Sequence, residues 1–189
     1  RRAKLVHGAG VLAGVFNVLP GSGRDGGEPI GRQMDVDRGS FTGATATGRR
    51  FLAYAGEANL KRIVLECGGK NPAVVMPDAE DRDAVAQHVV NGAFWNMGEN
   101  CSASSRLIVH ADVKDALLER IAHHLRDWKL GDPLDPENRL GSMVSRAHFD
   151  KVRSNLEHAA SEQMNVVSGG GTKDDIFVEA TIVDDVTPD

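Results

Sequence analysis

The chain has 189 residues, of which 41% are hydrophobic and 21 are glycine, a composition that fits a globular protein and excludes a disordered chain. It has 22 basic and 27 acidic residues, and no run of Lys or Arg makes a stripe that would follow nucleic-acid phosphates. No apolar run approaches the roughly 18 residues that cross a bilayer, and no signal-peptide core precedes the first elements. We therefore expect a soluble, cytoplasmic protein with neither a nucleic-acid partner nor a membrane.

The number of cysteines and the spacing of the histidines argue against a disulfide framework and against a common zinc site. Cys67 and Cys101 are too few for a disulfide framework, and none of the 7 histidines stands in a zinc spacing such as H-E-x-x-H. We expect no metal site, and if either cysteine has a function, that function depends on its thiol.

The first third of the chain predicts a helix over Arg1–Ala9 and a buried strand over the apolar run Gly14–Leu19. Residues 21–26 match the dinucleotide pattern G-x-G-x-x-G, and Glu28–Gln33 can form a short helix after it. No acidic residue follows at the distance of roughly 20 residues that a ribose contact needs, so the match alone is weak.

A better phosphate candidate follows a strand predicted over Asp37–Thr42. Residues 43–48 are glycine, alanine and threonine, and a helix is expected over Arg49–Ala58. A helix N-terminus offers free backbone N–H groups and the positive end of its dipole to an anion. The alternative is that Thr45 or Thr47 merely caps the helix.

Two positions are candidates for reactive groups. Glu66 ends a strand predicted over Lys61–Glu66, beside a Gly-Gly turn that can project it into a cleft, although a solvated loop carboxylate is the alternative. Cys101 follows a helix predicted over Asp81–Met97 and lies among small residues, although a free cysteine is often an inert core residue.

The other predicted elements are scaffold. Asp112 is expected to cap a helix that runs to Trp128, and His123 and His124 are expected on its surface. The helix has an i, i+4 stripe made of Val113, Leu117, Ile121 and Leu125. Further strands are predicted over residues 73–76, 106–110 and 176–186, a helix over 147–160 and a loop over 168–173.

Three motifs together resemble the NAD(P)-dependent aldehyde dehydrogenase superfamily: Phe41–Gly48, Leu65–Pro72 and Asn96–Cys101. The resemblance implies an aldehyde-dehydrogenase-like α/β fold. Residues 1–66 would be the C-terminal part of a Rossmann-like NAD(P)-binding domain, and residues 67–189 the N-terminal part of the catalytic domain.

The resemblance also implies roles for the two reactive candidates. Cys101 matches the nucleophile that attacks the aldehyde, and Glu66 matches the general base that deprotonates water to hydrolyse the thioester after hydride transfer to the nicotinamide. These roles suit the side chains, because a thiolate is both a strong nucleophile and a good leaving group.

Cofactor, substrate and assembly are likewise implied by the resemblance. The residues that match the cofactor-binding turns are Gly23, Gly27, Gly43, Ala44 and Gly68, with NAD as the cofactor and NADP not excluded. Phe94 and Trp95 would line the aldehyde tunnel of an enzyme similar to the subgroup that acts on γ-glutamylaminobutyraldehyde-like and betaine aldehydes, with general aliphatic aldehydes as the alternative. The full-length parent would form a homo-oligomer, a dimer or a tetramer.

Two residues depart from the family pattern, because Ala44 replaces a common Ser and Cys67 a common Leu. Other functional residues of the family have no counterpart, so we expect a truncated fragment. One alternative is a catalytically inactive remnant that binds at most a nucleotide or a partner. Another is a cysteine hydrolase, which would need a His close to Cys101.

Overall fold

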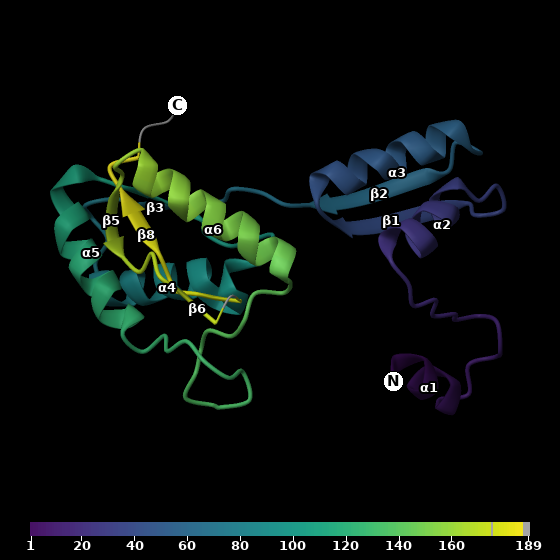
Figure 1. Ribbon diagram of the computed structural model, residues 1–189, viewed down its shortest axis with the longest axis horizontal. Coiled ribbons are helices and arrows are strands. Elements are labelled where there is room, and N and C mark those ends of the chain that lie inside the picture. The colour runs from purple at the N-terminus through teal and green to yellow at the C-terminus, as the bar shows by residue number, and fades with distance from the viewer. Residues whose placement is uncertain (175, 187–189) are drawn as a thin grey trace. The chain divides into compact units, whose positions relative to one another are not determined.

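The computed structural model describes residues 1–174 and 176–186, which form two compact units, Arg1–Gly68 and Gly69–Asp189 (Figure 1). Both units contain a strand, a helix and a second parallel strand, so the predicted α/β class is confirmed. The helices are α1 Arg2–Gly8, α2 Glu28–Arg32, α3 Thr45–Glu57, α4 Arg82–Phe94, α5 Ala111–Leu125 and α6 Arg146–Ser161, with a π-helical turn Gly23–Gly27 and a 3₁₀ turn Trp95–Gly98. The strands are β1 Arg38–Gly43, β2 Arg62–Cys67, β3 Pro72–Val75, β4 Arg106–Val109, β5 Asn165–Ser168, β6 Thr172–Lys173, β7 Phe177–Val178 and β8 Ile182–Asp184.

The first unit is organised around β1, α3 and β2. The two strands pair in parallel, from Arg38 opposite Arg62 to Gly43 opposite Cys67, and α3 connects them and packs against both. Phe41 on the sheet stacks on Phe51 of α3 with ring centroids 5.1 Å apart. Alternation along the strands places one face of the sheet under the helix.

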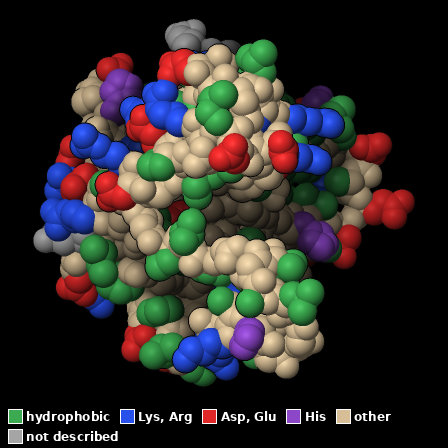
Figure 2. Space-filling model, turned by 90° about the vertical axis from the view of Figure 1, so that its right-hand side faces the viewer, with side chains coloured by type: hydrophobic (Ala, Val, Ile, Leu, Met, Phe, Trp, Pro, Cys, Tyr) green, Lys and Arg blue, Asp and Glu red, His purple; other side chains and the backbone are tan. Residues whose placement is uncertain are grey.

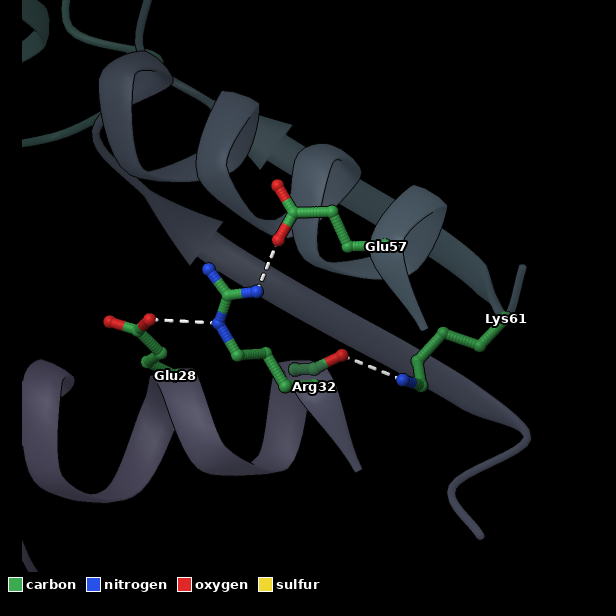
Figure 3. A network of polar contacts seen from close by, with 5 residues as sticks. Glu28, Arg32, Glu57 and Lys61 are labelled. Atoms are coloured by element: carbon green, nitrogen blue, oxygen red, sulfur yellow. Dashed lines mark hydrogen bonds and ion pairs between the residues drawn. The ribbon is translucent and has the colours of Figure 1, made fainter. Parts of the chain in front are cut away.

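Polar contacts fix α2 against this βαβ unit (Figure 3). Arg32 of α2 binds Glu28 one turn earlier, at 2.8 Å, and also Glu57 near the end of α3. Lys61, only 6% exposed, donates from Nζ to the carbonyl oxygen of Gly31 at 2.6 Å. A buried ammonium needs such an acceptor, so Lys61 ties the end of α2 to the start of β2.

One predicted strand of the first unit is wrong. Residues 14–19 form turns and irregular backbone, whereas the helices expected at Arg1–Ala9 and Glu28–Gln33 are present as α1 and α2. In that run Val15 is 71% exposed and Leu19 is 74% exposed. A strand needs a hydrogen-bonded neighbour, and the strand ladder of β1 described in this unit is with β2.

The second unit has its core between α4, α5 and the parallel pair β3 and β4. Residues of α4 and α5 pack together with Val75 of β3, and the predicted stripe on α5 is buried at all of its positions. The predicted cap of α5 is wrong, because His110 accepts from the backbone of Asp112 and Asp112 lies in the first turn. The helix therefore begins two residues earlier than a cap at Asp112 predicts, at Ala111 instead of Val113.

The C-terminal part of this unit is antiparallel. β5 pairs with β8, with an irregularity between Val166 and Ser168, and β6 pairs with β7. The single strand predicted over residues 176–186 is therefore wrong, since β7 and β8 have different partners. Similarly, the expected loop at residues 168–173 ends in the short strand β6.

On the face shown in Figure 2, acidic and basic side chains alternate with hydrophobic ones. Within the described part of the chain, none of the helices combines the length and the hydropathy that spanning a bilayer requires.

Candidate active site

The loop that carries Cys101 begins where α4 ends. The helix stops at Phe94, three residues before the predicted end, because Asn96 and Met97 adopt left-handed backbone angles (φ of 52° and 56°) and Gly98 continues the turn (φ of 72°). Non-glycine residues seldom adopt such angles, so the surrounding contacts must hold the turn. The turn brings Cys101 to an exposed position, which rules out a place in the core of its unit.

The backbone that follows Cys101 is held by Asn71, directly before β3, and by α4. The side-chain amide of Asn71 donates to the carbonyl oxygens of Cys101 (2.8 Å) and Ala103 (3.3 Å). The N–H of Ser104 donates to the carbonyl oxygen of Gly92 in α4 at 2.9 Å. The carbonyl groups of Cys101 and Ala103 are thus hydrogen-bonded within the unit, and the Cys101 thiol donates to Oδ1 of the neighbouring Asn100 at 3.7 Å.

Glu99 fixes the other side of the loop, and the sequence analysis did not single it out. Its Oε1 accepts from the backbone N–H of Val144 at 3.1 Å and lies 3.4 Å from Nε2 of His148 on α6, with the side chain 12% exposed. Val144 and His148 lie more than forty residues further along the chain. Nothing in a local pattern predicts that pairing.

Glu66 lies in β2 of the first unit, opposite Thr42 in the parallel register, and is exposed. Its neighbour Cys67 is half-buried and faces α3, where a Cβ added at Gly48 would lie 3.1 Å from Sγ. Because successive side chains alternate across a strand, Glu66 faces away from α3. One cysteine is therefore a packing residue beneath a helix and the other an exposed loop residue.

The turn between β1 and α3 has an open helix N-terminus. The helix begins at Thr45 rather than at the predicted Arg49, its N-cap is Ala44, and no side chain caps it. The interpretation of Thr45 or Thr47 as the cap is therefore wrong. The first turn of α3 contains no acidic residue, so no carboxylate there opposes the positive end of the helix dipole.

The other predicted cofactor residues lie in two places of the same unit. Gly23 and Gly27 begin and end the π-helical turn before α2, and Gly27 directly precedes α2 as its N-cap. Gly68 follows the last residue of β2. The structure thus places Gly27 and Ala44 at helix starts, Gly43 at the end of β1 and Gly68 directly after β2.

The two predicted tunnel residues differ in their surroundings. Phe94 packs edge-on against Trp128, with ring centroids 6.3 Å apart, at the border of the core of the second unit. Trp95 is 63% exposed. Among the described residues, no group of three or more His, Cys, Asp or Glu side chains is arranged to hold a metal ion.

The model of the aldehyde dehydrogenase family matches residues 1–189, the whole of the chain. The chain belongs to the aldehyde dehydrogenase family. It is 68% identical over 188 residues to aminoacetaldehyde dehydrogenase from Pseudomonas aeruginosa, a match that covers 100% of this chain and 38% of that protein. The chain thus spans well under half the length of this curated relative.

Solved structures agree with the sequence match. The aldehyde dehydrogenase KauB from Pseudomonas aeruginosa is 41% identical, with a TM-score of 0.95 over 98% of this chain and 38% of that one. The indole-3-acetaldehyde dehydrogenase AldA from P. syringae, solved in complex with NAD⁺, is 39% identical with the same TM-score and covers the same shares of the two chains, 98% and 38%. The aldehyde-dehydrogenase-like fold expected from the three motifs is therefore confirmed.

Proposed function

We propose that the complete gene product oxidises an aldehyde to a carboxylic acid with NAD(P)⁺, and that this chain contributes the nucleophile Cys101 and the general base Glu66. The first unit is part of the cofactor domain in this proposal, and the second unit is part of the catalytic domain. The observation that carries the proposal is the exposed thiol on the turn after α4, in a chain that matches the family along its whole length.

The residues of the β1–α3 turn fit the pyrophosphate of a dinucleotide. Ala44 leaves the N-terminus of α3 uncapped, and the first turn holds no carboxylate to repel phosphate. A Cβ at Gly43 would lie 2.7 Å from the Phe41 ring, so no side chain fits at this position. With glycine there, the backbone can come close to the phosphate. Gly23, Gly27 and Gly68 are proposed to complete the contacts, with NAD as the cofactor and NADP as the alternative.

The proposed chemistry begins with the Cys101 thiolate, whose Sγ forms a bond to the carbonyl carbon of the aldehyde. The nicotinamide of the bound cofactor supplies the hydride acceptor. Cys101 then holds the acyl group as a thioester, and Glu66 takes a proton from the water that attacks the acyl carbon. Cleavage of the C–S bond releases the carboxylic acid and restores the thiolate, and Glu66 then loses the proton to solvent, which restores the base.

We propose a small aldehyde that carries an amino or related nitrogen group as the substrate. The 68% identity to aminoacetaldehyde dehydrogenase supports this choice, and the γ-glutamylaminobutyraldehyde and betaine-aldehyde subgroup expected from the motifs has the same chemistry. In this proposal the exposed Trp95 lines the aldehyde tunnel with Phe94 behind it. Comparing kcat/KM for aminoacetaldehyde, betaine aldehyde and propanal tests the substrate class, and a preference for propanal would contradict it.

The two cysteines provide a matched test of the reaction. In the complete gene product, Cys101→Ala should abolish aldehyde-dependent NADH formation, whereas Cys67→Ala should retain most of it because Cys67 packs beneath α3. Absorbance at the NADH band measures both variants. Equal losses would contradict the assigned roles, and an inactive wild-type protein would favour the alternative of an inactive remnant. A cytoplasmic location and assembly as a dimer or tetramer stay predictions.

A further inference from the structure

Asn71 is attached to the Cys101 loop by two hydrogen bonds from one side-chain amide. Its Nδ2 donates to the carbonyl oxygen of Cys101 at 2.8 Å and to that of Ala103 at 3.3 Å. These carbonyl groups stand on either side of Ser102, so one amide group fixes two peptide planes of the loop. The first of them belongs to Cys101 itself, whose Cα carries the CH₂–SH side chain.

Asn71 is itself held firmly. Its carbonyl oxygen accepts from the backbone N–H of Arg106 at 3.3 Å, just before the parallel register of β3 and β4 begins with Pro72 opposite Arg106. The Arg106 guanidinium donates to the carbonyl oxygen of Lys70 from Nε (3.1 Å) and Nη2 (2.5 Å). The amide therefore reaches the loop from a backbone that is fixed on both sides of its Cα.

We propose that Asn71 is a positioning residue for the Cys101 nucleophile, an inference that rests on the proposed function. The peptide plane that follows Cys101 sets the direction of its Cα–Cβ bond, and this direction together with the χ1 rotamer determines the place of Sγ. A reacting atom displaced by about 1 Å can lose about 100-fold in rate. Asn71 touches neither the aldehyde nor the cofactor in this proposal, so its effect falls on acylation by Cys101 and not on cofactor binding.

The chain contains a matched control for this role. Asn59, in the other unit, also donates from one Nδ2 to two carbonyl oxygens, those of Met34 at 2.6 Å and Val36 at 3.0 Å. Asn71→Asp and Asn59→Asp thus make the same change, replacing the donor with an acceptor of the same size that repels both carbonyl groups. Asn71→Ala removes the donor without adding charge, and carries the test if Asn71→Asp fails to fold.

The experiment uses the complete gene product with NAD⁺ and aminoacetaldehyde in rapid mixing. Both Asn71 variants should lower the rate constant of the NADH burst by roughly 10- to 100-fold while the Kd for NAD⁺ stays unchanged. Hydrogen exchange of the peptide that contains residues 101–105 should be roughly 2- to 10-fold faster. Asn59→Asp should alter the burst rate and this exchange much less, even where its Tm falls as far.

A burst rate and an exchange rate equal to those of the wild type in both Asn71 variants would overturn the inference. An equal slowing of the burst in Asn59→Asp would also overturn it, because the effect would then be general destabilisation. If the wild-type protein oxidises no aldehyde, the proposed function fails, and the exchange measurement alone decides whether Asn71 holds the loop.

Discussion

The two βαβ segments of the chain share a topology and differ in how their helices begin. Helix α3 starts with Ala44 as its N-cap, with no capping side chain and no acidic residue in its first turn. Helix α4 starts with Asp81, whose Oδ1 accepts from the N–H groups of Asp83 (3.1 Å) and Ala84 (3.0 Å). The capping carboxylate of Asp81 occupies the N–H groups that an anion would need, so of these two helices α3 is the one that keeps its N-terminus available.

The helix ends differ as well. After α3 the chain crosses a short turn into β2, and Glu66 lies in that strand. After α4 the chain makes a left-handed turn before β4, and Cys101 lies in the loop that follows it. The two βαβ segments thus carry their candidate groups differently, with Glu66 on a strand and Cys101 on a loop. The loop needs separate contacts to hold its shape, and Asn71 and Glu99 supply them.

The largest expected effect concerns Glu66. In the complete gene product, Glu66→Gln should slow steady-state turnover by roughly 10²–10⁴-fold, because the water that attacks the thioester loses its base. A burst of NADH should survive, since hydride transfer precedes hydrolysis. Rapid-mixing absorbance measures both phases. Glu119→Gln, an exposed carboxylate on α5, is the control, and loss of the burst in Glu66→Gln with cofactor still bound would contradict the role.

The contacts of the loop after α4 predict the next effect. Glu99→Ala removes the acceptor of the Val144 N–H, which water can replace because Val144 is exposed, so the free energy of unfolding should fall by about 0.5–1.5 kcal/mol. Glu99→Gln keeps an acceptor oxygen in the same place and should retain most of that stability. Urea denaturation of both variants measures the difference, and equal losses would mean that the charge beside His148 matters more than the hydrogen bond.

Exchanging the N-cap residues of α3 and α4 tests whether the uncapped N-terminus of α3 binds the cofactor. Ala44→Asp should stabilise α3 by about 0.5–2 kcal/mol and at the same time weaken NAD⁺ binding by roughly tenfold, since a carboxylate would stand where phosphate is proposed to bind. Asp81→Ala should destabilise by a similar amount without changing NAD⁺ affinity. Thermal denaturation and calorimetric titration measure the two quantities, and unchanged affinity in Ala44→Asp would place the pyrophosphate elsewhere.

The smallest expected effect concerns two ion-pair clusters, one in each unit. Each has one cation, Arg32 or Lys114, between two carboxylates. Hydrogen bonding to Arg32 lowers the pKa of Glu28, and hydrogen bonding to Lys114 lowers the pKa of Asp184. A lowered carboxyl pKa adds stability above the unfolded-state value of about 4, and this stability is lost as the pH falls through the folded-state pKa. Hydrogen bonds to Asp184 and Asp185 raise the pKa of Lys114, a contribution that persists through neutral pH.

Lys114→Met and Arg32→Met test this pair of predictions. Each variant should unfold at lower urea concentration than the wild type at neutral pH, and the difference should shrink as the pH falls below about 4. All of these side chains are partly exposed, so salt should also reduce the difference. A difference that stays constant down to acidic pH would assign the effect to lost packing of the long side chains instead.

The sequence pattern predicted those helices and strands whose formation depends on residues close together in the chain. The i, i+4 stripe of α5 is buried as expected, and the four strands β1, β2, β3 and β4 begin and end within one residue of their predicted bounds. Gly14–Leu19 has the same apolar character and is no strand, because strand formation depends on a neighbour that hydropathy does not reveal. The predicted end of α4 was wrong for a related reason, since Met97 fits the helical spacing yet lies in a left-handed turn.

The sequence by itself determined the family, the two reactive candidates and the turn between β1 and α3, because these depend on residue types at fixed spacing. Only the tertiary structure showed that Ala44 leaves α3 uncapped, that Cys67 packs beneath α3 while Cys101 is exposed, and that Asn71 and Glu99 hold the Cys101 loop. Asn71 and Cys101 are thirty residues apart, and Glu99 and Val144 are 45 apart. Contacts at that separation form when strands pair and helices pack, so no local pattern contains them.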